Sequence, residues 1–139
     1  MPGKLHLVIN TPTEEKVNIQ TDMVIMRTVT GDMGILPGHE PASAALDLGV
    51  LRIFNDGEEK KMALLGGIAK VERDTLNIVA NNAEWPEELD HARAIATRDD
   101  FQERMLTSAD DLEIQSNQVQ LRRALVRIEV SSYSVLSKT

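Results

Sequence analysis

The first half of the chain alternates hydrophobic and polar positions in short runs separated by turn residues. The clearest run covers residues 5–10, and others cover 17–19, 23–29, 50–54, 62–65, 68–71 and 75–80. Alternation with a period of two places one face of a β-strand in a core and the other in water. Many short strands of this kind predict an antiparallel β-sandwich or barrel.

Turn signals separate these runs. Asn55-Asp56-Gly57 is a hairpin-turn sequence between two apolar runs. Gly66-Gly67 interrupts the next run, and Arg73-Asp74 precedes the last one. Gly31, Gly34 and Pro37-Gly38 indicate two bends before His39, which we expect in a loop.

The pattern changes near residue 85. Pro86 suits the first position of a helix, and the acidic residues that follow it suit the positive end of the helix dipole. A first helix is expected to end near Leu106, with a break over residues 107–110 and a second helix from about Asp111 into the 130s. Ile114, Leu121, Leu125 and Ile128 form one apolar stripe of that second helix. The prediction is a β-sandwich domain over residues 1–84 and a two-helix domain over 85–139, α+β overall.

Composition narrows the possible functions of the 139 residues. The net charge of −7 argues against nucleic acid as a partner, because a phosphate backbone would be repelled. No apolar run approaches the length of a membrane span, and no signal-peptide pattern is visible at the start. The absence of cysteine excludes disulfides and thiolate metal sites. Aromatic residues make up only 3%, so the core is expected to consist of Val, Ile, Leu, Met and Ala.

No constellation in the sequence predicts catalysis. His6, His39 and His91 are too widely spaced for a metal-ligand pair, and there is no nucleophile elbow or phosphate-binding glycine loop. His39 is the best single candidate, but such a residue is more often a structural hydrogen-bonding group. We therefore expect a protein without its own catalytic site and without a bound metal.

The stretch LDHARA places Asp90 and Arg93 three positions apart, in a region rich in arginine. Arginine suits carboxylate or phosphate recognition better than lysine does. Six arginines fall in the helical region, at positions 93, 98, 104, 122, 123 and 127. Composition alone favours a simpler interpretation, because helices tolerate arginine well and surface ion pairs contribute under about 1 kcal/mol.

The stretch GDMGILPGHEP, residues 31–41, is distinctive and resembles the signature of the epsilon subunit of bacterial F-type ATP synthase. LHLVINTP is similar to the first strand and turn of that family, and LLGGIAKVERDTLNIVA to its last β segment. AEWPEELDHARA resembles the entry to its helical hairpin. The resemblance covers nearly the whole chain. It departs at Ala42, Ser43 and Ala44, which are smaller than usual, and in the terminal SSYSVLSKT.

The resemblance implies a non-catalytic rotor subunit, peripheral on the cytoplasmic face of the bacterial plasma membrane and not inserted in it. In the family, the β domain contacts the gamma subunit and the c-ring. The hairpin lies folded on the β domain, or extends toward the alpha and beta subunits and inhibits ATP hydrolysis. Candidate residues for contact with gamma or the c-ring are Gly31, Leu36, Pro37, His39 and Pro41.

The resemblance also implies an ATP site, because family members that bind ATP carry a motif of the form I/L-D-x-x-R-A. The residues implied are Glu84, Leu89, Asp90, Arg93, Ala94, Arg98, Arg123 and Arg127. ATP would be a regulatory ligand of the folded hairpin, no other cofactor is required, and magnesium is not expected to be essential. Two alternatives stay open: a coupling subunit without relevant ATP sensing, and a stand-alone β-domain adaptor.

Overall fold

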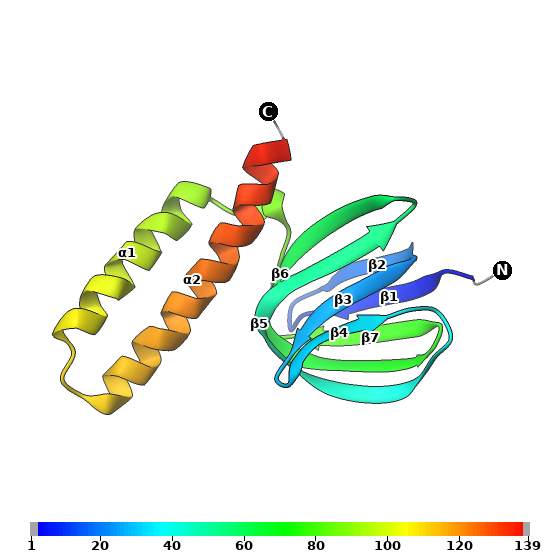
Figure 1. The fold of residues 1–139 in the computed structure, drawn as a ribbon, viewed down its shortest axis with the longest axis horizontal. Coiled ribbons are helices and arrows are strands. Elements are labelled where there is room, and N and C mark those ends of the chain that lie inside the picture. The colour runs from blue at the N-terminus through cyan, green and yellow to red at the C-terminus, as the bar shows by residue number, and fades with distance from the viewer. Residues whose placement is uncertain (1–2, 138–139) are drawn as a thin grey trace. The chain divides into compact units, whose positions relative to one another are not determined.

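The computed structural model describes residues 3–137 and separates the chain into two compact units, with the division between Glu84 and Trp85. Figure 1 shows a unit made of curved strands and a unit made of two helices. Residues 138–139, the end of the SSYSVLSKT segment, lie outside the described residues.

The first unit is a β-sandwich of eight strands. The strands are β1 (Leu5–Asn10), β2 (Glu15–Thr21), β3 (Met23–Thr28), β4 (Gly31–Ile35), β5 (His39–Asn55), β6 (Glu58–Arg73), β7 (Thr75–Ala80) and β8 (Ala83–Glu84). Their hydrogen-bonded order is β2-β1-β7-β6-β5-β3-β4, and the short β8 pairs with β6. The β1–β7 pair is parallel, whereas the other pairs are antiparallel.

Two long strands connect the layers of the sandwich. β5 has 17 residues and β6 has 16, so both are longer than a typical strand and must bend to stay with a compact core. Gly66 and Gly67 supply the bend in β6, because both have positive φ, at 84° and 137°. A Cβ atom at Gly67 would lie 2.3 Å from the carbonyl oxygen of Val79. Only glycine therefore allows β6 to approach β7 this closely.

The core of the sandwich is aliphatic, which confirms the expectation from the low aromatic content. The largest fully buried side chains come from alternating positions of the strands. They are Leu5, Leu7, Ile9, Val24, Met26, Ile35, Leu51, Ile53, Met62, Leu65, Leu76 and Ile78.

A polar cluster joins the start of β1 to two turns. Lys4 Nζ lies 2.7 Å from Asp22 Oδ1 and 2.8 Å from Asp56 Oδ1, and the backbone N–H of Asp56 donates to Asp22 Oδ2 at 2.7 Å. The Lys4 hydrogen bond and then the Asp56 N–H lower the pKa of Asp22 below its usual value of 3.8. The same two carboxylates raise the pKa of Lys4, with Asp22 contributing most. This cluster connects three segments that are distant in the sequence.

The predicted runs and the observed strands differ around the glycines. The run at 50–54 is the end of β5, and the two runs at 62–65 and 68–71 form one strand, β6. Residues 31–35 form β4, which pairs with β3, where a turn at Gly31 and Gly34 was expected. The second expected bend, at Pro37-Gly38, is the turn between β4 and β5. His39 begins β5 and does not lie in a loop. Glycines suggested interruptions here, but cross-strand pairing continues through Gly34 and Gly67, so each strand continues past its glycine.

The second unit consists of a 3₁₀ turn, η1 (Pro86–Glu88), and the helices α1 (His91–Thr107) and α2 (Asp111–Ser137). The break between the helices falls where it was predicted. Pro86 begins only this short 3₁₀ turn. The prediction of a continuous helix from Pro86 was wrong, because η1 ends at Glu88 and the backbone of Leu89 is extended (φ −99°, ψ 138°). The backbone N–H of Trp85 donates to Glu88 Oε1 at 2.9 Å, so this turn has its own N-terminal cap.

Candidate functional site

The LDHARA stretch forms the start of α1. Asp90 is the N-cap, and its Oδ1 accepts a hydrogen bond from the backbone N–H of Arg93 at 3.0 Å. This is the usual role of aspartate at a helix start, because the first N–H groups of a helix lack partners within the helix. Within the described part of the chain, no ion pair joins the Asp90 and Arg93 side chains, and Arg93 is exposed. Ala94 is 7% exposed and is the buried residue of the helix.

Two hydrogen bonds establish how α1 and α2 are aligned. His91 Nδ1 lies 2.8 Å from Ser131 Oγ near one end of the pair, and Asn117 Nδ2 donates to Ser108 Oγ at 3.2 Å near the other. The helices are therefore antiparallel neighbours, as Figure 1 shows. This alignment places Arg98 of α1 level with the interval between the two α2 arginines of the candidate site.

Arg98 lies on the packing stripe of α1, although it is charged. The buried and half-buried positions of this helix recur at spacings of three and four. They include His91, Ala94, Arg98, Phe101 and Met105. The Arg98 side chain is 33% exposed and pairs with Asp99, with its Nη2 3.0 Å from Asp99 Oδ1. An arginine at such a position keeps its charged end at the edge of the helix pair.

Arg123 and Arg127 lie one turn apart on α2, each directly before a residue of its packing stripe, Ala124 and Ile128. Arg127 is half-buried and has interactions of its own. Arg123 differs, because its Nε is buried and has no hydrogen-bond partner among the described residues. Buried donors are nearly always paired with a protein group or with ordered water, so this N–H is an exception among the described residues.

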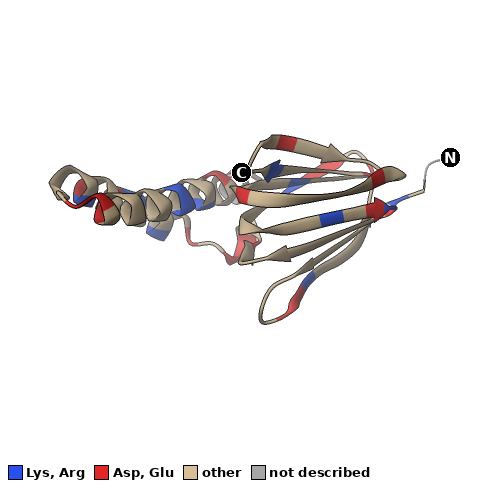
Figure 2. Cartoon of the chain, turned by 90° about the horizontal axis from the view of Figure 1, so that it is seen from below, with Lys and Arg blue, Asp and Glu red and all other residues tan. Residues whose placement is uncertain are grey.

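Glu84 belongs to the other unit, where it is the second residue of β8 and its Oε2 lies 3.4 Å from Asn82 Nδ2. Leu89 is half-buried between η1 and α1. The hairpin thus carries seven of the eight residues implied for an ATP site. Figure 2 shows basic positions along the hairpin and acidic positions at both of its ends.

The second group of candidate residues lies at the β4–β5 connection. Leu36 is 56% exposed, Gly31 and Pro41 are exposed, and Pro37 and His39 are half-buried. Gly38 has φ 81°, and its N–H lies 2.7 Å from Asp74 Oδ1, so the turn is tied to the β6–β7 turn. His39 Nδ1 lies 2.7 Å from the carbonyl oxygen of Glu40, which is a local structural contact.

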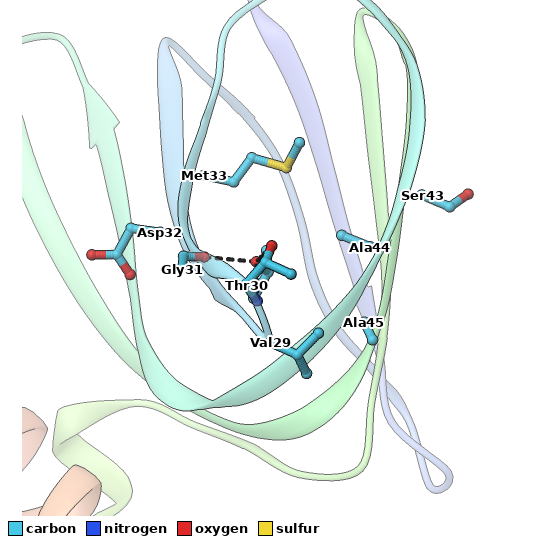
Figure 3. A pocket seen from close by; sticks show the side chains of 9 residues that line it. Val29, Thr30, Gly31, Asp32, Met33, Ser43, Ala44 and Ala45 are labelled. Atoms are coloured by element: carbon cyan, nitrogen blue, oxygen red, sulfur yellow. Dashed lines mark hydrogen bonds between the residues drawn. The ribbon is translucent and has the colours of Figure 1, made fainter.

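A hollow of about 410 Å³ lies beside the turn between β3 and β4, away from the β4–β5 connection, and Figure 3 shows its lining. Met33 from β4 and Ala44 and Ala45 from β5 line it, together with the turn that contains Val29. Thr28 Oγ1 donates to the carbonyl oxygen of Gly31 at 2.7 Å and closes that turn. Val29 is 64% exposed, and with Met33 and the two alanines it forms the apolar part of a lining that also includes Thr30, Asp32 and Ser43. An exposed apolar side chain beside a hollow is a feature of surfaces that contact another protein.

The sequence did not reveal the link between His91 and Ser131. The two residues are 40 positions apart, and no motif connects them.

Among the residues described, no group of histidine and acidic side chains could hold a metal ion. None of the described helices is long and apolar enough to cross a membrane.

Comparison with known proteins identifies the family. Residues 4–86 match the family profile "ATP synthase, Delta/Epsilon chain, beta-sandwich domain". The ATP synthase epsilon chain of Bacillus subtilis is 39% identical over 123 residues, covering 88% of this chain and 93% of that one. The epsilon chain of Synechococcus sp. (strain WH7803) is 36% identical over 133 residues, covering 91% and 96%.

Solved structures show the same fold. A chain of the Euglena gracilis mitochondrial ATP synthase matches with a TM-score of 0.81 at 22% identity, covering 98% of this chain and 83% of that one. A chain of the Tetrahymena thermophila mitochondrial ATP synthase central stalk and c-ring matches with a TM-score of 0.60 at 17% identity, covering 96% and 97%. Together, the family profile and the relatives in sequence show that this protein belongs to the ATP synthase epsilon chain family, whose members are non-catalytic subunits of the synthase.

Proposed function

We propose that this chain is a rotor subunit of the ATP synthase central stalk, in which the sandwich contacts the gamma subunit and the c-ring. The hairpin inhibits ATP hydrolysis when it extends toward the alpha and beta subunits. ATP binds the folded hairpin and favours the non-inhibitory state. Membership of the family supports the first part of this proposal, and the arginines of the hairpin support the second.

The buried, unpaired Nε of Arg123 is the observation that carries the ATP site. Arg127 lies one turn further along α2, and Arg98 of α1 lies at the same level of the helix pair. Arginines from two helices can bind one polyphosphate only while the helices are side by side, because each guanidinium needs its own phosphate oxygens. A ligand bound in this way would stabilise the folded hairpin and lose its site when the helices separate.

The energy available suits a regulatory ligand. A ligand that binds only one of two states stabilises that state by about 1.4 kcal/mol when the free ligand concentration is ten times Kd. This changes the ratio of folded to extended hairpins about tenfold. The hairpin is suited to such control, since α1 buries only Ala94 completely and its packing against α2 is correspondingly weak.

The hollow beside β4, with its exposed Val29, and the exposed Leu36 support contact with gamma or the c-ring. Asp74 holds the Pro37-Gly38 turn in place, so Leu36 is presented without much loss of conformational entropy on binding. We expect a chain ending at residue 86 to fold and to bind gamma, because it retains β8 and its pairing with Ala63 and Leu64.

Calorimetric titration of the full chain with ATP, in EDTA and again with magnesium, tests the site. We expect saturable binding in both conditions, because arginines and not a metal neutralise the phosphates. Absence of binding would contradict the ATP site and leave the subunit assignment intact.

Hydrolysis by the reconstituted synthase at low ATP tests the hairpin. The chain ending at residue 86 should relieve inhibition, and equal hydrolysis rates with the full and the shortened chain would contradict regulation.

One observation favours a second candidate, a coupling subunit without relevant ATP sensing. The carboxylate of Asp90 caps α1, so this part of the LDHARA motif has a structural role without any ligand. ATP titration decides between the two candidates, because the second predicts no binding at cellular ATP concentrations.

A further inference from the structure

A hydrogen bond joins the two helices directly beside the proposed nucleotide site. His91 is the first residue of α1, after the Asp90 N-cap, and its Nδ1 lies 2.8 Å from Ser131 Oγ on α2. His91 is half-buried and Ser131 is only 1% exposed. The contact therefore closes the end of the hairpin at which α1 starts.

The direction of this hydrogen bond follows from the other contacts of Ser131. Its hydroxyl has one proton, and Oγ lies 2.6 Å from the carbonyl oxygen of Arg127, which can only accept. The proton is directed to that carbonyl, so Oγ accepts a hydrogen bond from His91 Nδ1–H. One continuous chain of hydrogen bonds then runs from the first residue of α1 through Ser131 to the backbone of Arg127.

We infer that His91 and Ser131 are positioning residues that fasten the open end of the hairpin and hold Arg127 next to the start of α1. The role in placing Arg127 for ATP rests on the proposed function, whereas the fastening of the two helices does not. Both residues act through the hairpin and neither needs to touch the nucleotide.

The weak packing of α1 gives this single contact its importance. Ala94 is the buried residue of α1, and the other residues of its packing stripe are only half-buried, so the fully buried part of this helix is small. A hydrogen bond with a net contribution of the ordinary size changes the local opening equilibrium about two- to tenfold. At the opposite end, the loop at residues 108–110 connects the helices covalently, so the same loss of contact there would have less effect.

A purely local role for Ser131 predicts the opposite result on substitution. The hydroxyl of a mid-helix serine that only bonds to its own helix competes with the backbone, and alanine is the better helix former. If Ser131 has only this role, Ser131→Ala leaves the hairpin unchanged or more closed. If Ser131 fastens the two helices, Ser131→Ala opens it despite the gain in helix propensity. The sign of the change therefore separates the two roles.

Residue-resolved amide hydrogen exchange of the full chain without nucleotide provides the measurement. We expect Ser131→Ala and His91→Phe each to speed exchange of the amides in residues 94–98 and 124–130 about two- to tenfold, while amides of the sandwich keep their rates. Ser131→Thr, which retains the hydroxyl, should restore the slow exchange. Ser116→Ala is the matched control, since Ser116 is an exposed serine of the same helix. Unchanged or slower exchange in Ser131→Ala would overturn the inference.

A spectroscopic signature adds a check that a packing role would not produce. The nitrogen chemical shifts of the neutral His91 ring should show the proton on Nδ1 in the natural chain, and this preference should disappear in Ser131→Ala. A proton on Nε2 in the natural chain would contradict the assigned hydrogen bond.

ATP titration of the same variants separates this inference from the proposed function. If ATP binds the natural chain, Ser131→Ala should weaken binding by no more than about the factor by which it speeds exchange, because the ligand must first close the hairpin. If ATP does not bind the natural chain, the nucleotide site is wrong and the exchange data alone decide the fastening role.

Discussion

The side chain of Asp90 contacts the main chain of Arg93: the Asp90 carboxylate accepts a hydrogen bond from the backbone N–H of Arg93 at 3.0 Å. The spacing of three that suggested an ion pair is the spacing of an N-cap and the N–H that it caps. The guanidinium of Arg93 is exposed and is not held by Asp90. A ligand could therefore engage Arg93 without first breaking an ion pair between these two residues.

This relationship gives the Asp90 substitutions two separable effects. Asp90→Ala removes both the helix cap and the carboxylate, whereas Asp90→Ser keeps a capping oxygen and removes the charge. Both variants are measured by amide hydrogen exchange and by ATP calorimetry. Loss of an N-cap costs about 0.5–2 kcal/mol, so only Asp90→Ala should speed exchange at the start of α1. Both should weaken ATP binding if the carboxylate contacts the nucleotide. ATP affinity that falls in Asp90→Ala alone would limit Asp90 to capping.

Arg123 should be needed for ATP binding and should destabilise the folded protein when ATP is absent. Arg123→Met removes a buried, unpaired donor, whose burial costs about 1–3 kcal/mol, so the ATP-free protein should be at least as stable as the natural chain to urea. ATP affinity should fall by about one to two decades, the size of one charge-assisted hydrogen bond. The control is Arg104→Met, because Arg104 pairs with Asp100 at 3.0 Å and lies near the joined end. A less stable Arg123→Met with unchanged affinity would refute the site.

Gly67 should be irreplaceable in the sandwich. Gly67→Ala places a Cβ 2.3 Å from the carbonyl oxygen of Val79 at a φ of 137°, and we expect a loss of about 2–4 kcal/mol in unfolding free energy. Gly34→Ala is the matched control, because it has free space for a Cβ and no positive φ. Circular dichroism of the β signal in urea measures both. Similar midpoints for the two variants would contradict the close approach of β6 and β7.

The Asp22 cluster should make the sandwich sensitive to acid. The pKa of Asp22 is lowered in the folded state, so its contribution is complete above the usual value of 3.8 and is lost as the pH falls through the folded value. Asp22→Asn should therefore unfold at a lower temperature than the natural chain at pH 7, and the two melting temperatures should converge as the pH falls through the lowered pKa of Asp22. Glu72→Gln, at an exposed site, should follow the natural chain across this pH range. A gap that persists at low pH would show that Asp22 acts through its shape rather than its charge.

Local patterns in the sequence were sufficient for the fold class and for most element positions. Period-two alternation marked β1 and β7 almost to the residue, and turn residues marked the break between the helices, because both signals act through neighbouring residues. The family motifs pointed to the arginines of the hairpin. The same local signals failed at residues 31–35, where glycines suggested a turn but the chain forms β4 and pairs with β3, whereas Pro37-Gly38 correctly marked the turn that follows.

Contacts between residues that are distant in the sequence became apparent only in the tertiary structure. The continuity of β5 and β6 depends on their pairing with each other along their whole length, which no short window can show. Pro86 suggested a helix start, but the extended backbone at Leu89 and the cap at Asp90 delayed it to His91. The hydrogen bond between His91 and Ser131 forms only when the two helices lie side by side. The Nε of Arg123 becomes buried and unpaired only when the folded chain encloses it. Burial and pairing of this kind are properties of the packed chain, and residue order does not encode them in any local pattern.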